Sequence, residues 1–161
     1  MRKILFITIF AFLFFIIEFI VFNMIGRWAM PNLLILIVIF VNLSFGIRYG
    51  LFTAVLAGVI KDSFSTSFFG INVFSFVVCA YMTTILKRYF YDKHSRSSRL
   101  LLVFSICLIN VLVHFVLYTM FGVVDIIQTF QYILIPEIFT TLIVTAYTFR
   151  QLKKCVLRLF V

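Results

Sequence analysis

Residues 4–25 read ILFITIFAFLFFIIEFIVFNMI, a run of 22 residues in which nearly every side chain is apolar. A helix needs roughly 20 such residues to cross the hydrocarbon core of a bilayer. Arg2 and Lys3 precede the run, as they would in a secretory signal, but the run is longer than a typical signal core and no Ala-x-Ala cleavage pattern follows it. We therefore expect residues 4–25 to form a retained first transmembrane helix.

The composition of the whole chain agrees with a lipid environment. Of its 161 residues, 65% are hydrophobic and 12% are charged, and the mean hydropathy is +1.22. A soluble domain of this size has too little polar surface to cover so much apolar side chain. The sequence therefore predicts an all-α, polytopic integral membrane protein that has no room for a soluble domain.

Five further apolar segments follow the first. The second and third are short, since their apolar cores would form helices of only about 20 Å and 18 Å. They fit either two full crossings or a hairpin that enters from one side of the membrane. The predicted single membrane domain, residues 1–161, has spans at 4–25, 32–47, 49–62, 71–86, 100–124 and 132–149, with a basic tail at 150–161.

Basic residues indicate the orientation of these spans. They cluster at the N-terminus, at residues 87–99 and at residues 150–158. The positive-inside rule places all three clusters in the cytoplasm, so an even number of crossings separates each pair. We therefore predict six transmembrane helices with cytoplasmic N- and C-termini. The basic tail suits anionic lipid at the cytoplasmic face. Since the same charges orient the helices, we expect no nucleic-acid partner.

Small residues recur at every fourth position before the third expected loop. Gly50, Ala54 and Gly58 share one helix face, which Gly46 precedes and Asp62 ends. Because lipid gives no hydrophobic drive for helix association, such stripes indicate where helix backbones approach closely. Two hypotheses remain open: packing within this chain, or packing against another membrane protein.

Asp62 is poorly placed for its own helix, because a carboxylate near a helix C-terminus opposes the macrodipole. In one hypothesis its oxygens accept amide protons from Ser63–Ser65 and cap the following turn. In the other, it forms a salt bridge or hydrogen bond to another helix or to a partner protein.

Other polar residues of interest lie inside the predicted spans. Glu18 is surrounded by apolar residues in the first span, and an ionisable group at this depth is a functional hypothesis by default. Asn110 and His114, four residues apart in the fifth span, are possible partners of Glu18 by residue type. An interhelical hydrogen bond that only sets helix packing would explain Glu18 equally well. Pro136 and Glu137 suit the first turn of the last span.

Motifs that would indicate catalysis or metal binding do not occur in the sequence. Cys79, Cys107 and Cys155 lack metal-type spacing, and there is no HExxH, CxxC or phosphate-binding glycine loop. We expect no cofactor, no metal site and no enzymatic activity.

The order of these features resembles the bacterial rod shape-determining protein MreD family over almost the whole chain. The resemblance rests on the size, on the six-span pattern and on a set of short motifs. The motifs are Pro31-Asn32 before a hydrophobic run, Gly58-x-x-x-Asp62-x-x-Ser65 followed by Gly70, a helix ending in Ala80-Tyr81, and Pro136-Glu137. The chain departs from the family pattern at Lys61, directly before Asp62, and at residues 65–67, where more glycine is expected.

The resemblance implies a scaffold or regulator of peptidoglycan elongation in the bacterial cytoplasmic membrane. MreD-like proteins maintain rod shape with the bitopic protein MreC, near the actin-like MreB filament and a wall glycosyltransferase and transpeptidase. The family is also similar in architecture to the substrate-capture (S) components of energy-coupling-factor transporters, so capture of a vitamin or other small molecule is the alternative. Those subunits carry a small-residue pattern on their first span, whereas Phe10–Phe15 contains only one small residue, Ala11.

Overall fold

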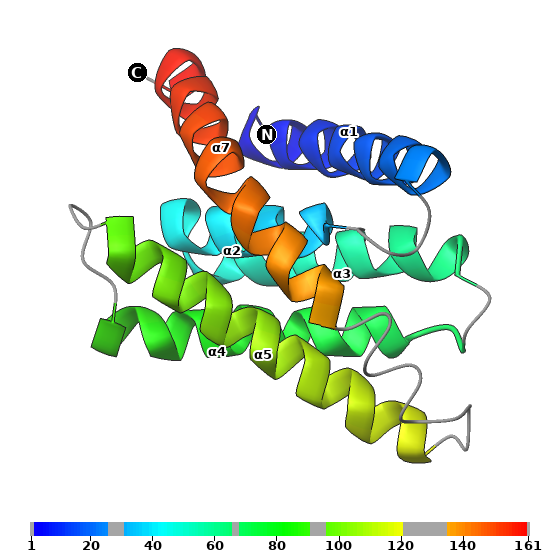
Figure 1. Cartoon of the computed structure of the whole chain (residues 1–161). Coiled ribbons are helices and arrows are strands. Elements are labelled where there is room, and N and C mark those ends of the chain that lie inside the picture. The colour runs from blue at the N-terminus through cyan, green and yellow to red at the C-terminus, as the bar shows by residue number, and fades with distance from the viewer. Residues whose placement is uncertain (1, 26–30, 66–67, 91–95, 121–134, 161) are drawn as a thin grey trace.

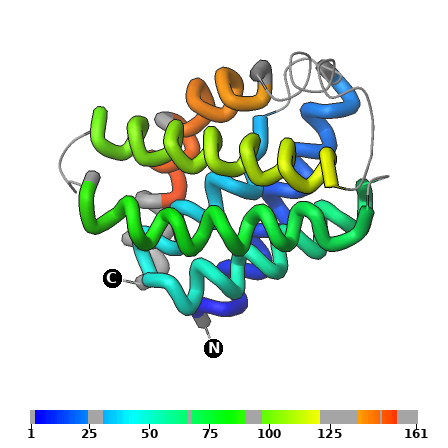
Figure 2. Tube along the Cα trace, turned by 90° about the horizontal axis from the view of Figure 1, so that it is seen from below, coloured from blue at the N-terminus to red at the C-terminus, as the bar shows by residue number. Residues whose placement is uncertain are grey.

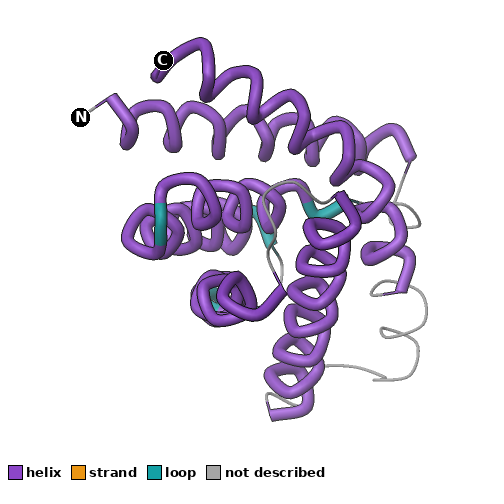
Figure 3. Tube along the Cα trace, turned by 90° about the vertical axis from the view of Figure 1, so that its left-hand side faces the viewer, coloured by secondary structure: helices purple, strands orange, loops and turns teal. Residues whose placement is uncertain are grey.

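The computed structural model describes residues 2–25, 31–65, 68–90, 96–120 and 135–160. Within these ranges all regular structure is helical and there is no strand (Figure 3). The predicted all-α fold is thus confirmed. The helices are α1 (Arg2–Ile25), α2 (Leu33–Phe45), α3 (Ile47–Ser63), α4 (Ile71–Phe90), α5 (Arg96–Met120) and α7 (Ile135–Phe160).

Three of the described helices are long and apolar enough to cross a membrane. These stretches are Lys3–Met24, Ile71–Tyr89 and Ser97–Met120, and α2 is a shorter apolar helix. The helices run beyond several predicted limits: α4 continues past residue 86, and α5 begins before residue 100. The predicted span residues 121–124 and 132–134 lie outside the described ranges.

Helix α7 continues without a break through the predicted basic tail to Phe160. Residues 138–160 contain neither glycine nor proline, and the residue types that follow the apolar part include good helix formers such as leucine, lysine and arginine. Nothing in this sequence therefore ends the helix at the point where its hydrophobicity falls.

Consecutive helices run back and forth, so that their ends gather at two ends of the molecule (Figure 1). The N-terminus, the α2–α3 turn and the facing ends of α4 and α5 lie toward one end. Seen from below, α4 and α5 lie side by side (Figure 2), in agreement with the contacts between them. Helix α2 contacts each of the other five described helices and is therefore the centre of the bundle.

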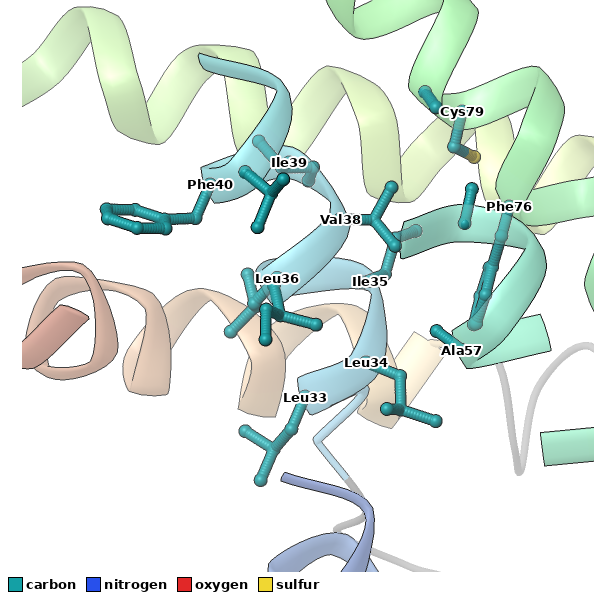
Figure 4. Close-up of a cluster of buried hydrophobic side chains, with 14 of the residues drawn as sticks. Leu33, Leu34, Ile35, Leu36, Val38, Ile39, Phe40, Ala57, Phe76 and Cys79 are labelled. Carbon is teal, nitrogen blue, oxygen red and sulfur yellow. The ribbon is translucent and has the colours of Figure 1, made fainter. Parts of the chain in front are cut away.

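The sequence of α2 explains its central position. Residues 33–41 read LLILIVIFV, with no polar face, and every residue from Leu33 to Asn42 is buried. A helix that is hydrophobic all round is stable only when it is surrounded. Figure 4 shows its side chains pointing to several sides, with Ala57 of α3 and Phe76 of α4 among their neighbours. By contrast, α1 exposes a row of large apolar side chains such as Phe12 and Ile16, as expected of a helix at the lipid boundary.

Helix α3 packs closely against α2 and α4 through its small residues. A Cβ added at Gly50 would lie 2.7 Å from the Cβ of Asn42 in α2. A Cβ added at Gly58 would lie against the Cα of Val73 in α4, 2.8 Å from the Val73 amide nitrogen. Ala54, between the two glycines, is fully buried. The stripe is therefore covered by helices of this chain.

Candidate functional site

Glu18 of α1 caps the N-terminus of the central helix. Its Oε2 accepts hydrogen bonds from the amides of Leu33 (3.0 Å) and Leu34 (3.2 Å), and its Oε1 lies 3.2 Å from Nζ of Lys61 in α3. The first amides of a helix have no partner inside the helix, and a negative charge is favourable there. One buried carboxylate therefore joins α1, α2 and α3.

The other end of α2 is held by α4. Nζ of Lys87 donates to the carbonyl of Leu43 at 3.0 Å, so a positive charge meets the C-terminal end of the helix. One turn before the end, the Asn42 side chain donates to the carbonyl of Ala80 and to Oγ1 of Thr84. Thus α2 receives an acidic cap at its start and a basic cap at its end, each from a different helix.

These caps explain how so short a helix is accommodated. With 13 residues α2 is about 20 Å long, whereas the hydrocarbon core is about 30 Å thick. Backbone polar groups cannot face lipid unpaired, and non-helical chain at that depth is tolerated where protein covers it. Glu18 and Lys87 supply hydrogen-bond partners for terminal backbone groups of α2.

Asp62 performs the same task for α4. Its Oδ2 accepts from the amides of Gly70 (2.9 Å) and Val73 (3.2 Å), and its Oδ1 accepts from the amide (3.1 Å) and the side chain (2.8 Å) of Asn72. The amide of Ser65 instead donates to the backbone carbonyl of Asp62. The carboxylate therefore bonds to the start of another helix, which is the second of the two hypotheses.

Glu137 lies in the first turn of α7, as does Pro136, and its side chain reaches the start of α2. Asn32 is the N-cap of α2: its Oδ1 accepts from the amide of Ile35 at 3.2 Å, and its Nδ2 donates to Oε1 of Glu137 at 2.6 Å. The Asn32 amide donates to Oγ1 of Thr141 at 3.0 Å. Glu137 therefore links α7 to α2. The expected role of Glu137 at a helix start did not include this link.

Asn110 and His114 are buried in α5, but neither bonds to Glu18 in the described structure. Oδ1 of Asn110 accepts from Oγ of Ser75 in α4 at 2.6 Å. The His114 ring lies 5.7 Å from that of Tyr118, between ring centroids, and its Nδ1 has no hydrogen-bond partner. Asn110 and His114, which suit Glu18 as partners by type, therefore do not bond to it in the described structure; Lys61 and two backbone amides do.

Sequence reasoning did not identify Lys61, Lys87, Asn42 or Asn72 as site residues. Lys61 stood out only as a departure from the family pattern, and Lys87 only as part of the charge that orients the helices. Asn42 carried a usable signal, since it is the sole amide in an otherwise apolar run. A polar side chain in such a run usually bonds across helices.

The arrangement fixes helices rather than presenting reactive groups. The carboxylates of Glu18, Asp62 and Glu137 all accept hydrogen bonds from the chain itself. No group of three or more His, Cys, Asp or Glu residues in the described ranges is placed to hold a metal ion. Its observable chemistry is helix capping and helix-to-helix hydrogen bonding.

The unequal roles within the Glu18–Lys61 pair can be tested. Glu18→Leu removes two backbone caps and leaves the half-buried Lys61 without its partner; removing one member of a buried ion pair costs roughly 3–5 kcal/mol in other proteins. Lys61→Met removes the ion pair and the cation–π contact of Lys61 with Phe76. It keeps both backbone caps on the Glu18 carboxylate and replaces a half-buried side chain, so its cost is smaller. Thermal unfolding of the purified protein in detergent should give a larger fall in Tm for Glu18→Leu. Equal falls would contradict the capping role.

Comparison with known proteins places this arrangement in a family. Residues 1–153 match the model of the family described as rod shape-determining protein MreD. No curated protein and no solved structure shows significant similarity to the chain. Because the match covers nearly all of the 161 residues, the chain belongs to the MreD family of rod shape-determining proteins.

Proposed function

We propose that this protein is a non-enzymatic membrane scaffold of the machinery that elongates the wall of rod-shaped bacteria. It acts in the cytoplasmic membrane with an MreC-like bitopic partner and, directly or through that partner, with an MreB-like filament and the wall glycosyltransferase and transpeptidase. The observation that carries the proposal is the family match over residues 1–153. The capped, tightly packed helix ends support it, because a scaffold needs a fixed shape.

The proposed topology has six crossings, with both termini in the cytoplasm. Its support is the alternation of helix directions in Figure 1, which brings the N-terminus, the α2–α3 turn and the α4–α5 ends together. Arg48 lies in the first turn of α3, and Lys87 and Arg88 lie in the last turn of α4, so basic residues belong to this same end. The positive-inside rule assigns that end to the cytoplasm.

The packing also limits where a partner helix can dock. The face formed by Gly50, Ala54 and Gly58 is buried against α2 and α4. A membrane partner would therefore contact a different surface, and these residues would influence it only through the shape of the bundle.

Depletion and co-purification test the proposal. Cells depleted of this protein should lose their rod shape and become round, and a tagged copy should co-purify with an MreC-like protein from gently solubilised membranes. Complementation with Val59→Leu, a change on the exposed face of α3, should restore rods and serve as the matched control. Normal rods after depletion, with no such partner recovered, would contradict the proposal. A stoichiometric small molecule found in the purified protein by mass spectrometry would favour the transporter alternative.

A further inference from the structure

A small internal cavity lies where α2, α5 and α7 meet. Four polar residues contribute to its wall: Asn32, Asn110, Glu137 and Thr141. The cavity offers about 10 Å³ to the centre of a water molecule, and one buried water needs roughly 10–15 Å³ measured in this way. Its size therefore fits a single water, and its wall has the polar partners that such a water requires.

Two of the residues that line this cavity, Asn110 and Glu137, each have one polar side-chain atom without a partner in the described part of the chain. Oδ1 of Asn110 accepts from Ser75 and from the thiol of Cys79, which leaves the Asn110 amide nitrogen without an acceptor. Oε1 of Glu137 accepts from Asn32, which leaves Oε2 without a donor. The only fully enclosed side-chain atom without a partner among the described residues belongs to His114, so neither of these two atoms is sealed off by protein.

One donor and one acceptor without partners thus belong to residues that line the same water-sized space. A buried donor or acceptor without a partner is costly, and a water in a polar cavity commonly makes about three hydrogen bonds. Oγ1 of Thr141, which donates to the Glu137 carbonyl and accepts from the Asn32 amide, still has capacity to accept. The cavity therefore supplies one donor and two acceptors.

We infer that the cavity binds one ordered water molecule, which accepts from Nδ2 of Asn110 and donates to Glu137 and to Thr141. The water joins two hydrogen-bonded groups that have no direct bond between them. One is the Ser75–Asn110 pair of α4 and α5; the other is the Asn32–Glu137–Thr141 group of α2 and α7. It extends the polar contacts of the first half of α7 to the α4–α5 pair.

Magnetisation transfer from water in solid-state NMR tests this inference directly. The full-length protein, labelled with ¹⁵N-asparagine and reconstituted in lipid bilayers, should show transfer from water to the side-chain amide of Asn110, a signal assigned by its absence in Asn110→Ser. Asn42 is the internal control, because it is equally buried and its amide donates to Ala80 and Thr84. The Asn42 amide should show no transfer. Equal or absent transfer at the two amides would overturn the inference.

A matched pair of variants separates this water from general solvent penetration. Val111 lines the cavity, whereas Val116 is exposed on the same helix. Val111→Ile adds one methylene where the water lies and should abolish the Asn110 transfer, while Val116→Ile should leave it unchanged. Should Val111→Ile prevent folding, Cys107→Val, at another lining position, replaces it with the same expectation. Transfer that persists in a folded cavity-filling variant would overturn the inference.

Discussion

Gly58→Ala is expected to force α3 away from α4 and to lower the stability of the bundle strongly. The new Cβ would meet the backbone of Val73, which cannot rotate away as a side chain can. Overpacking typically costs 1–3 kcal/mol, and contact with backbone places this variant at about 3 kcal/mol or more. A loss of that size lowers Tm by roughly 6–12 °C in a chain of this length. Thermal unfolding followed by size-exclusion chromatography in detergent measures it.

Val59→Leu is the control for this prediction, because the next residue along α3 is exposed and has room for a larger side chain. Its Tm should remain close to that of the unchanged protein. Gly58→Leu should then fail to give a monodisperse bundle. A Gly58→Ala protein as stable as Val59→Leu would refute the close approach of the two helices.

Asp62→Leu is the second change with a large expected effect. It removes the acceptor of four hydrogen bonds at the start of α4, from Gly70, Asn72 and Val73. Hydrogen bonds to charged groups contribute roughly 1.5–3 kcal/mol each, so we expect little folded protein in the membrane fraction. Asp62→Asn keeps one oxygen for Asn72 but turns an amide donor toward other donors, and it should give an intermediate yield.

Ser63→Ala provides the comparison for Asp62, since Ser63 is exposed and its hydroxyl bonds only within α3, to the carbonyl of Val59. It should fold with a normal yield and Tm. The amount of folded protein per cell should therefore be highest for Ser63→Ala, lower for Asp62→Asn and lowest for Asp62→Leu. A normal yield from Asp62→Leu would show that α4 starts without this cap.

The apolar runs were enough to predict the helices, because each is determined locally by hydrophobicity over about a dozen residues or more. The contacts between helices could not be predicted from these runs, because they depend on which helix faces meet in the folded protein. Glu18 was recognised as significant, yet its partner, Lys61, lies 43 residues away on another helix. Only the packed arrangement brings that lysine and the start of α2 to the same carboxylate.

The small-residue stripe shows the same limit. Spacing alone identified Gly50, Ala54 and Gly58 as a place of close helix approach, but it contained no information about which helix approaches. The structure supplies α2 at Gly50 and α4 at Gly58. Likewise, Asp62 was identified as misplaced for its own helix, and only the position of the next helix explains which amides it binds.

The two caps of α2 also have a consequence for the order of synthesis. Glu18 precedes α2 in the chain, so its carboxylate has already been made when the helix emerges, whereas Lys87 is added 44 residues after Leu43. A nascent chain that stops before residue 87 therefore contains the carboxylate that caps the first turn of α2 but lacks the lysine that bonds to the Leu43 carbonyl. We therefore expect α2 to depend on its contacts with α1 and α3 during synthesis, until α4 has been made and Lys87 reaches the Leu43 carbonyl.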